Sequence, residues 1–214
     1  LVHILCVVVR AVEMDAIPKP QGMDREFQVQ VLTLADMDGT TAVLNEGFGS
    51  KMCCCCIPGT ETVSMVSGRY KKCPAKLEVS AVAKAPDGAV LGVLLMAEYG
   101  MPIYPPGLHT NKPGEMYIEQ IAVSAAARGQ GVGGKLIDWG ESLARERGAT
   151  MLSLAVIHGN PAIGLYERKG FVKRPVDDPC ETCCTSLIIC LLMGRPYGLC
   201  SPACGGMNMQ KPLV

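Results

Sequence analysis

The sequence predicts an α/β fold built around one mixed β-sheet. Segments with the two-residue period of strands alternate along the chain with segments of helical spacing. Two strand-like segments flank a short Pro-Asp-Gly turn, which is typical of an antiparallel hairpin. A later strand-like segment leads into a glycine-rich turn that opens an amphipathic helix. Together these three observations favour helices packed around a single sheet.

Length and charge restrict the class of protein. The 214 residues fit one domain with appendages, and a hydrophobic share of 49% allows a sizeable core. Lys and Arg together number 20, as do Asp and Glu, so the chain lacks the basic excess of a nucleic-acid-binding protein. The apolar stretch Leu1–Val9 is about half as long as a membrane-spanning helix, and we expect no membrane span.

The chain divides into three expected parts. Residues 1–25 form an N-terminal extension whose last part, Ile17–Gly22, is rich in Pro and Gly and indicates a linker. Residues 26–194 form the folded domain. Residues 195–214 form a C-terminal tail that contains Cys and Gly.

A strand and a helix open the predicted domain. Phe27–Leu32 alternates apolar and polar residues, which indicates a half-buried strand. Thr33 is a candidate N-cap with Asp36 in the first helical turn, so we expect a helix from there to about Gly47. Residues 50–75 are expected to be irregular.

The next segments predict the hairpin and the second half of the sheet. Strands Leu77–Lys84 and Val90–Tyr99 flank the Pro86-Asp87-Gly88 turn, and residues 100–114 form a Pro- and Gly-containing loop. The remaining elements are expected, in order, as a strand over Glu115–Ser124, a helix over Gly131–Arg147, a strand over Met151–Ile157, a helix from its cap Asn160 to Gly170, and strands over Phe171–Val176 and Ser186–Met193.

The glycine-rich turn carries the chemistry. Glycines at positions 129, 131 and 133 let the main chain approach a ligand closely, and the helix that follows offers unpaired N–H groups and its positive dipole end. This arrangement suits a phosphate or a pyrophosphate. The spacing matches neither the Walker pattern nor the dinucleotide pattern G-x-G-x-x-G.

Two ordered motifs resemble those of the GNAT superfamily of N-acetyltransferases. The run Arg128-x-x-Gly131-x-Gly133 is similar to the family's acetyl-CoA pyrophosphate loop. Further along, the segment Asn160–Phe171 is similar to its second signature, an Asn followed by Ala-x-x-Leu-Tyr-x-x-x-Gly-Phe. The resemblance covers about Phe27–Met193 and is strongest over Tyr117–Lys173. It implies one GNAT-like domain, with the cofactor wedged between two splayed parallel strands.

The resemblance also implies which residues hold acetyl-CoA. Main-chain N–H groups of the turn would bind the pyrophosphate, and main-chain groups of the preceding strand would bind the pantetheine arm and the thioester carbonyl. Asn160 would contact the cofactor near its thiol end, although it also fits a simple helix cap. The implied cofactor-binding residues are Ile121, Ala122, Val123, Arg128, Gly129, Gln130, Gly131, Val132, Gly133, Gly134, Asn160 and Tyr166.

The implied reaction moves the acetyl group directly onto a primary amine, without a covalent enzyme intermediate. Tyr166 corresponds to the family's general acid, which would protonate the departing thiolate of coenzyme A. Glu119 is the first candidate for the base that takes a proton from the amine, and Glu115 is the second. A chain of water molecules is the alternative to either side chain. The acceptor amine is left open among small amines, polyamines, lysines and protein N-termini.

The 12 cysteines avoid the stretch between Pro74 and Pro179, so we expect a cytoplasmic protein with mostly reduced thiols. Cys180, Cys183, Cys200 and Cys204 approach the spacing of a zinc site, but spare thiols are favoured and no metal ligand is assigned. The run Cys53–Cys56 has no assigned role.

Two alternative functions accompany the enzyme hypothesis. One is a non-catalytic domain that binds acyl-CoA as a sensor. The other is a zinc or thiol protein that uses the cysteine clusters, with the glycine-rich turn as scaffolding only.

Overall fold

The fold is a seven-stranded sheet in the order β1-β2-β3-β4-β5-β7-β6, seen in a computed structural model that describes residues 26–48, 60–104, 109–157, 159–174 and 206–213. Along the chain the elements are β1 Gln28–Val31, the 3₁₀ helix η1 Leu34–Asp36, α1 Met37–Phe48, α2 Val63–Lys72, α3 Ala75–Glu78, β2 Ala81–Lys84, β3 Val90–Glu98, β4 Glu115–Val123, the 3₁₀ helix η3 Ala125–Ala127, α4 Val132–Glu146, β5 Met151–Ile157, α5 Ile163–Arg168, β6 Val172–Lys173 and β7 Gly206–Pro212. Both the α/β class and the single mixed sheet are confirmed.

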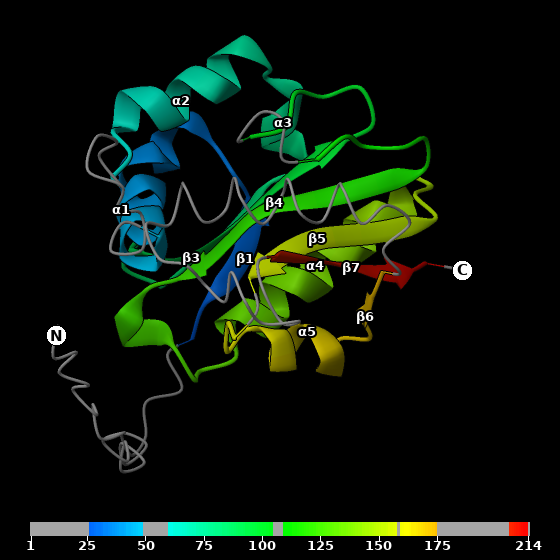
Figure 1. Ribbon diagram of the computed structural model, residues 1–214. Helices are drawn as coiled ribbons and strands as arrows, with labels where there is room; N and C mark the ends of the chain where they lie inside the picture. The colour runs from blue at the N-terminus through cyan, green and yellow to red at the C-terminus, as the bar shows by residue number, and fades with distance from the viewer. Residues whose placement is uncertain (1–25, 49–59, 105–108, 158, 175–205, 214) are drawn as a thin grey trace, which may run out of the picture.

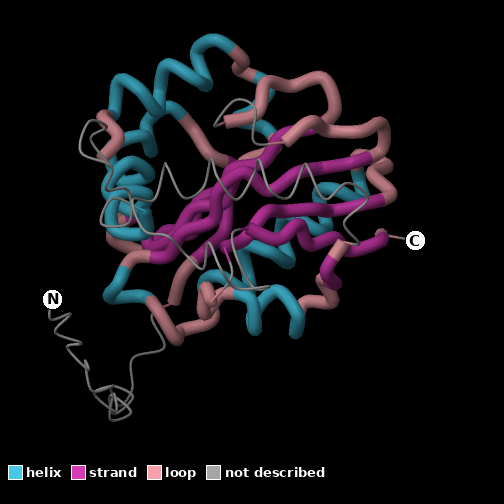
Figure 2. Tube along the Cα trace, in the orientation of Figure 1, coloured by secondary structure: helices cyan, strands magenta, loops and turns pink. Residues whose placement is uncertain are grey.

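Helices cover both faces of the sheet. Strands β4 and β5 form a parallel pair, and every other neighbouring pair is antiparallel. Helices α1 and α2 lie on one face, and α4 and α5 lie on the other (Figure 1). The tube view shows the strands crossing the middle of the molecule between these helices (Figure 2).

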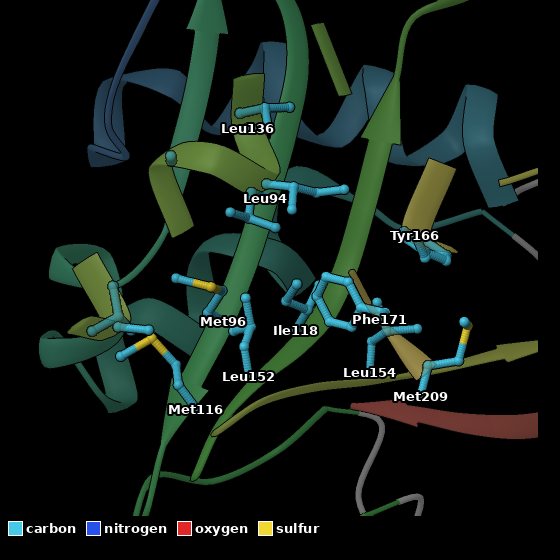
Figure 3. Packing of buried hydrophobic residues seen from close by; sticks show 14 of the residues in the cluster. Leu94, Met96, Met116, Ile118, Leu136, Leu152, Leu154, Tyr166, Phe171 and Met209 are labelled. Carbon is cyan, nitrogen blue, oxygen red and sulfur yellow. The ribbon is translucent and has the colours of Figure 1, made fainter. Parts of the chain in front are cut away.

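The larger core lies between the sheet and α4. Leu136 and Ile137 of α4 are fully buried against Leu94 and Met96 of β3. Side chains of β4 and β5 continue this core toward Tyr166 and Phe171 at the other end of the sheet (Figure 3). Helix α4 is therefore fixed along most of its length, which also fixes the turn that precedes it.

The predicted start of the first helix is confirmed. Thr33 forms a capping box with Asp36, whose Oδ2 accepts hydrogen bonds from the Thr33 N–H at 3.0 Å and the Thr33 hydroxyl at 2.7 Å. Lys84 of β2 forms an ion pair with the other Asp36 oxygen. Burial alone would raise the pKa of Asp36, but the hydrogen bonds from Lys84 and Thr33 outweigh it and lower the pKa.

We expect Asp36→Asn to lower the free energy of unfolding by about 1–2 kcal/mol at pH 7, because a cap and an ion pair are lost. A lowered pKa gives stability that is present above the unfolded-state pKa and is lost as the pH falls through the folded-state pKa. The deficit should therefore shrink when urea unfolding is repeated at acid pH. Asp87→Asn is the matched control. The Asp87 carboxylate is exposed, and in the described part of the chain it accepts one hydrogen bond, from the Ala89 N–H. An equal loss in both variants would contradict the role of Asp36.

Two predictions for the first half were wrong. Residues 50–75 were expected to be irregular, but they contain α2, whose N-cap Thr62 accepts a hydrogen bond from the Met65 N–H and whose Val66 and Tyr70 are buried. The hairpin's first strand was expected from Leu77 and begins only at β2, because the preceding residues form the short helix α3. Tertiary packing of a few apolar residues decides these elements more than local pattern does.

The C-terminal part also differs from the prediction. The helix expected from Asn160 begins two residues after Pro161, and the strand expected over Phe171–Val176 is described only as the short β6. The expected strand Ser186–Met193 lies outside the described residues. Strand β7 instead pairs with β5 over Met151–Ile157, so a segment assigned to the tail is part of the sheet. The alternation of apolar and polar residues in β7 is short, and the glycines and cysteines before it indicated a tail instead of a strand.

No helix within the described ranges is both long and apolar enough to cross a membrane.

Candidate active site

The two parallel strands separate partway along their length. β4 pairs with β5 only from Glu115 opposite Met151 to Ile118 opposite Leu154. Beyond Ile118, β4 continues to Val123 paired with β3 alone, and β5 continues beyond Leu154 paired with β7 alone. The main-chain groups that face the gap lack strand partners there, so a ligand can bond to them.

A β-bulge marks the start of this separation. Opposite β3, Leu95 pairs with Gln120 and Met96 pairs with Ile118, which leaves Glu119 as the extra residue. A bulge changes which way the following side chains point. The predicted base Glu119 thus lies at the bulge where β4 leaves β5.

Three hydrogen bonds fix the Glu119 carboxylate in place. Lys76 Nζ donates to both carboxylate oxygens at 2.6 and 2.7 Å, and the Tyr104 N–H donates to Oε1 at 2.7 Å. The Lys76 and Glu119 side chains are each 3% exposed. Burial raises the pKa of Glu119, and the Lys76 ammonium opposes that rise. Nearby, the Arg69 guanidinium lies 3.2 Å above the Tyr104 ring.

The glycine-rich turn has the backbone shape that its sequence requires. Gly129 and Gly131 have φ values of 77° and 82°, in the left-handed region that side-chain-bearing residues avoid. Gly131 is the N-cap of α4, and no side chain caps this helix. Within the part of the chain that the structure describes, a Cβ at Gly129 or Gly131 would have no atom within 4 Å. A ligand can therefore approach the uncapped start of α4 without meeting a side chain at Gly129 or Gly131.

Three elements meet at this turn. A Cβ added to Gly133 would lie 3.3 Å from Leu165 of α5 and 3.6 Å from Val123 of β4. A Cβ added to Gly134 would lie 3.4 Å from Lys169, just beyond α5. The structure therefore brings together the predicted turn, the end of β4 and the helix that carries Tyr166.

Side chains of the turn fix its own backbone. Arg128 Nε donates to the Val123 carbonyl at 3.2 Å, and Gln130 Nε2 donates to the Ala126 carbonyl at 2.8 Å. The Ala125 N–H donates to the Glu46 carboxylate of α1 at 2.8 Å. These bonds hold the turn against both β4 and α1.

Asn160 and Tyr166 occupy opposite ends of one short segment. Asn160 Oδ1 accepts the Ala162 N–H at 2.9 Å, which is a capping bond just ahead of α5. Tyr166 is 5% exposed, and its ring meets Phe171 edge-on with 6.1 Å between ring centres (Figure 3). Burial raises the pKa of Tyr166 to about 12, so its hydroxyl keeps its proton at neutral pH.

The other predicted site residues belong to β4 and to the start of α4. Ala122 is buried against α1 and its neighbours, whereas Ile121 and Val123 are half-buried toward α4. Gln130 and Val132 flank the N-cap of α4. The second candidate base, Glu115, lies at the other end of β4 from the turn.

Sequence reasoning missed a second polar group next to the separation. Tyr117 of β4 stacks on His109 with 4.2 Å between ring centres, and His109 Nε2 lies 3.0 Å from Glu115 Oε1. The carboxylate also accepts the Ser153 hydroxyl at 2.5 Å. His109 precedes β4 in a loop without local pattern, so only folding reveals its partners.

Among the residues that the structure describes, no group of three or more His, Cys, Asp or Glu side chains is arranged to hold a metal ion. Cys73 is the one cysteine in this part of the chain, and it is free. The four cysteines considered for zinc and the run Cys53–Cys56 lie outside the described residues.

Comparisons with known proteins agree with this geometry. The sequence profile of the Acetyltransferase (GNAT) family matches residues 67–171, from α2 through β4, α4 and β5 to the end of α5. No curated protein has a detectably similar sequence.

Solved structures share the fold. A GCN5-related N-acetyltransferase from Kribbella flavida is 21% identical, with 87% of this chain and 97% of that chain covered and a TM-score of 0.58. Ard1 from Thermoplasma volcanium is 17% identical, with coverages of 88% and 98% and a TM-score of 0.57. The PaiA N-acetyltransferase from Thermoplasma acidophilum, solved with coenzyme A, is 11% identical, with coverages of 87% and 99% and a TM-score of 0.57. The chain belongs to the GNAT family of acetyl-CoA-dependent N-acetyltransferases.

Proposed function

We propose that this protein transfers the acetyl group of acetyl-CoA directly onto a primary amine. The observation that carries the proposal is the separation of β4 from β5 beyond Ile118, next to the uncapped start of α4. An open pair of parallel strands offers main-chain groups to an extended ligand, and a helix start favours an anion at one end of that ligand. Acetyl-CoA has this form, a long amide-containing arm that ends in a pyrophosphate.

Residues of the turn fit the pyrophosphate. The N–H groups of Gln130, Gly131, Val132, Gly133 and Gly134 would bind its oxygens, with Gly129 providing the bend. Because Gly131 has a positive φ and open space around it, the phosphates can approach the main chain without meeting a side chain. Arg128 would act by holding the turn to the Val123 carbonyl, the bond it makes in this structure.

Residues of β4 and α5 fit the reacting end. Main-chain groups of Ile121, Ala122 and Val123 would bind the pantetheine arm, and Asn160 would lie near its thiol end. Tyr166 is buried and protonated at neutral pH, so its hydroxyl would donate to the sulfur as the carbonyl–sulfur bond breaks. Glu119 would place a negative charge near the incoming ammonium group.

An acetylation panel tests the function. Purified protein and acetyl-CoA are incubated with a small amine, a polyamine, a lysine peptide and a peptide with a free N-terminus, and thiol release is followed together with product mass. We expect at least one amine to gain one acetyl group per thiol released. Acetyl-CoA binding without turnover on any amine would favour a sensor. Absence of coenzyme A binding together with copurified zinc would favour the thiol or zinc protein.

A further inference from the structure

A buried imidazole–carboxylate pair lies at the start of β4, before the point where β4 and β5 separate. Met116, Ile118, Leu152 and Leu154 face the core under α4, so strand alternation puts Glu115, Tyr117 and Ser153 on the opposite face. His109 reaches this face from the loop before β4. Its side chain and that of Glu115 are each 8% exposed, and their polar atoms lie 3.0 Å apart.

The carboxylate of Glu115 fixes the state of the ring. It accepts hydrogen bonds from His109 Nε2, from the Ser153 hydroxyl and from the Lys112 N–H at 2.8 Å. Burial alone would raise the pKa of Glu115, but these three bonds outweigh it and lower the pKa to about 2. An ionised carboxylate only accepts hydrogen bonds, so Nε2 carries the proton. A neutral His109 therefore has its lone pair on Nδ1.

Stacking fixes the orientation of the same ring. The His109 and Tyr117 rings are nearly parallel, with an interplanar angle of 14°. The Tyr117 hydroxyl lies close to the main chain of Ala155. Ala155 is the first β5 residue beyond the pairing with β4. The stacked pair thus extends from the carboxylate to the edge of the strand separation.

A cavity of about 170 Å³ lies against these groups. Its lining includes His109, Tyr117 and Asn208, and Asn208 is the β7 partner of Ala155, the first β5 residue beyond the pairing with β4. Its volume is sufficient for several water molecules, since each occupies about 30 Å³ in the liquid. The polar residues Asn208 and Gln210 in its lining can bond such water molecules.

We propose that His109 accepts, through water in this cavity, the proton that the acceptor amine loses during acetyl transfer, and that Glu115 is its positioning residue. The inference rests on the proposed function and specifies the route by which the proton of the acceptor amine leaves. The amine nitrogen forms the new bond to the acetyl carbon, and the bond from that carbon to sulfur breaks. The amine proton passes to Nδ1, and the resulting imidazolium keeps its Nε2–H bond to Glu115. The thiolate takes its proton from Tyr166, His109 returns its proton to solvent, and Tyr166 regains a proton from solvent, which restores the starting state of the enzyme.

Charges around the cavity are consistent with this role. Two cationic residues, Lys112 and Arg174, also line the cavity, and Arg174 interacts with another residue as well. Ionised Glu115 supplies the counter-charge for the imidazolium that forms during the reaction. Two further polar groups, the Glu119 carboxylate and the Tyr117 hydroxyl, come from β4. Glu119 is the competing acceptor, but its oxygens already accept three hydrogen bonds, two of them from the Lys76 ammonium.

The test is the pH dependence of kcat/KM for the best amine of the panel. For wild type we expect kcat/KM to fall on the acid side, because a protonated base accepts no further proton. His109→Gln keeps a donor toward Glu115 but accepts no proton near neutral pH. It should lower kcat/KM by about 10²-fold at neutral pH, remove the acid-side fall, and recover part of its rate when free imidazole is added. Coenzyme A affinity should stay at the wild-type value.

Two further variants separate positioning from packing. Glu115→Gln should move the acid-side fall to lower pH, because the imidazolium loses its anionic partner. Ser153→Ala is the matched control, since it removes one bond to Glu115 and leaves the His109 contact in place; its pH profile should keep the wild-type shape.

Several outcomes overturn the inference. A folded His109→Gln protein with the wild-type rate and pH profile would do so. The inference would also be overturned if the acid-side fall disappeared in the double variant Lys76→Met/Glu119→Gln but remained in His109→Gln. Both residues are changed together so that neither buried charge is left unpaired. Wild-type protein that acetylates no amine at any pH would instead refute the proposed function itself, so the two failures are distinguishable.

Discussion

Gly131→Leu should weaken coenzyme A binding by about 10²-fold or more while the domain stays folded. A side chain at this position would occupy the space next to the first N–H groups of α4, where a Cβ now meets no atom within 4 Å. Hydrogen bonds to a charged group contribute about 1.5–3 kcal/mol each, so loss of two of them corresponds to about 10²-fold or more in Kd. Calorimetric titration with coenzyme A measures the effect.

Backbone strain needs its own control, because any side chain at a φ of 82° is strained. Gly88→Leu provides it. Gly88 lies in the β2–β3 hairpin with a φ of 87°, and its Cβ would also have no atom within 4 Å. Both variants should lose similar unfolding free energy, but only Gly131→Leu should lose binding. Wild-type affinity in a folded Gly131→Leu protein would contradict the assignment of the turn.

Gly133 is a less informative position for the same test. A Cβ there would already press on Leu165 at 3.3 Å, so a substitution would displace α5 as well as approach the ligand. Weakened binding would then have two causes. The distinction between Gly131 and Gly133 depends on how α4 and α5 pack, and the sequence motif treats the two glycines alike.

Local signals predicted much of the fold because they are strong in this chain. The capping box of Thr33 and Asp36, the hairpin turn at Gly88 and the apolar run Met151–Ile157 each specify their element with few residues. The motif at Arg128–Gly133 likewise marked the turn, since glycine alone adopts its backbone angles freely.

What the sequence did not predict depends on long-range contacts. Helix α2 has mixed composition and is fixed by burial of Val66 and Tyr70 against α1 and the sheet. Glu119 was predicted as the base, but its closest partner is Lys76, 43 positions earlier in the chain. The link between His109 and Ser153 through Glu115 joins a loop to a parallel strand. None of these pairs has a spacing that a local pattern can reveal.

Tyr166→Phe should lower kcat and kcat/KM together by about 10²–10⁴-fold, the contribution typical of a positioned general acid. The ring and its edge contact with Phe171 remain, so packing is nearly unchanged. A pKa of about 12 keeps the wild-type hydroxyl protonated, and it can therefore donate to the departing sulfur throughout the neutral range.

The measurement must isolate the chemical step, because slow product release would hide the loss. Single-turnover acetylation with enzyme in excess over acetyl-CoA gives the rate of that step directly. Coenzyme A affinity and the unfolding free energy should stay close to wild type, since the hydroxyl is expected to act only as the thiolate forms. The proton acceptor is a separate group, so the acid-side fall of the pH profile should survive in Tyr166→Phe although the rate drops at every pH. A Tyr166→Phe protein with the wild-type single-turnover rate would leave Tyr166 with a packing role alone.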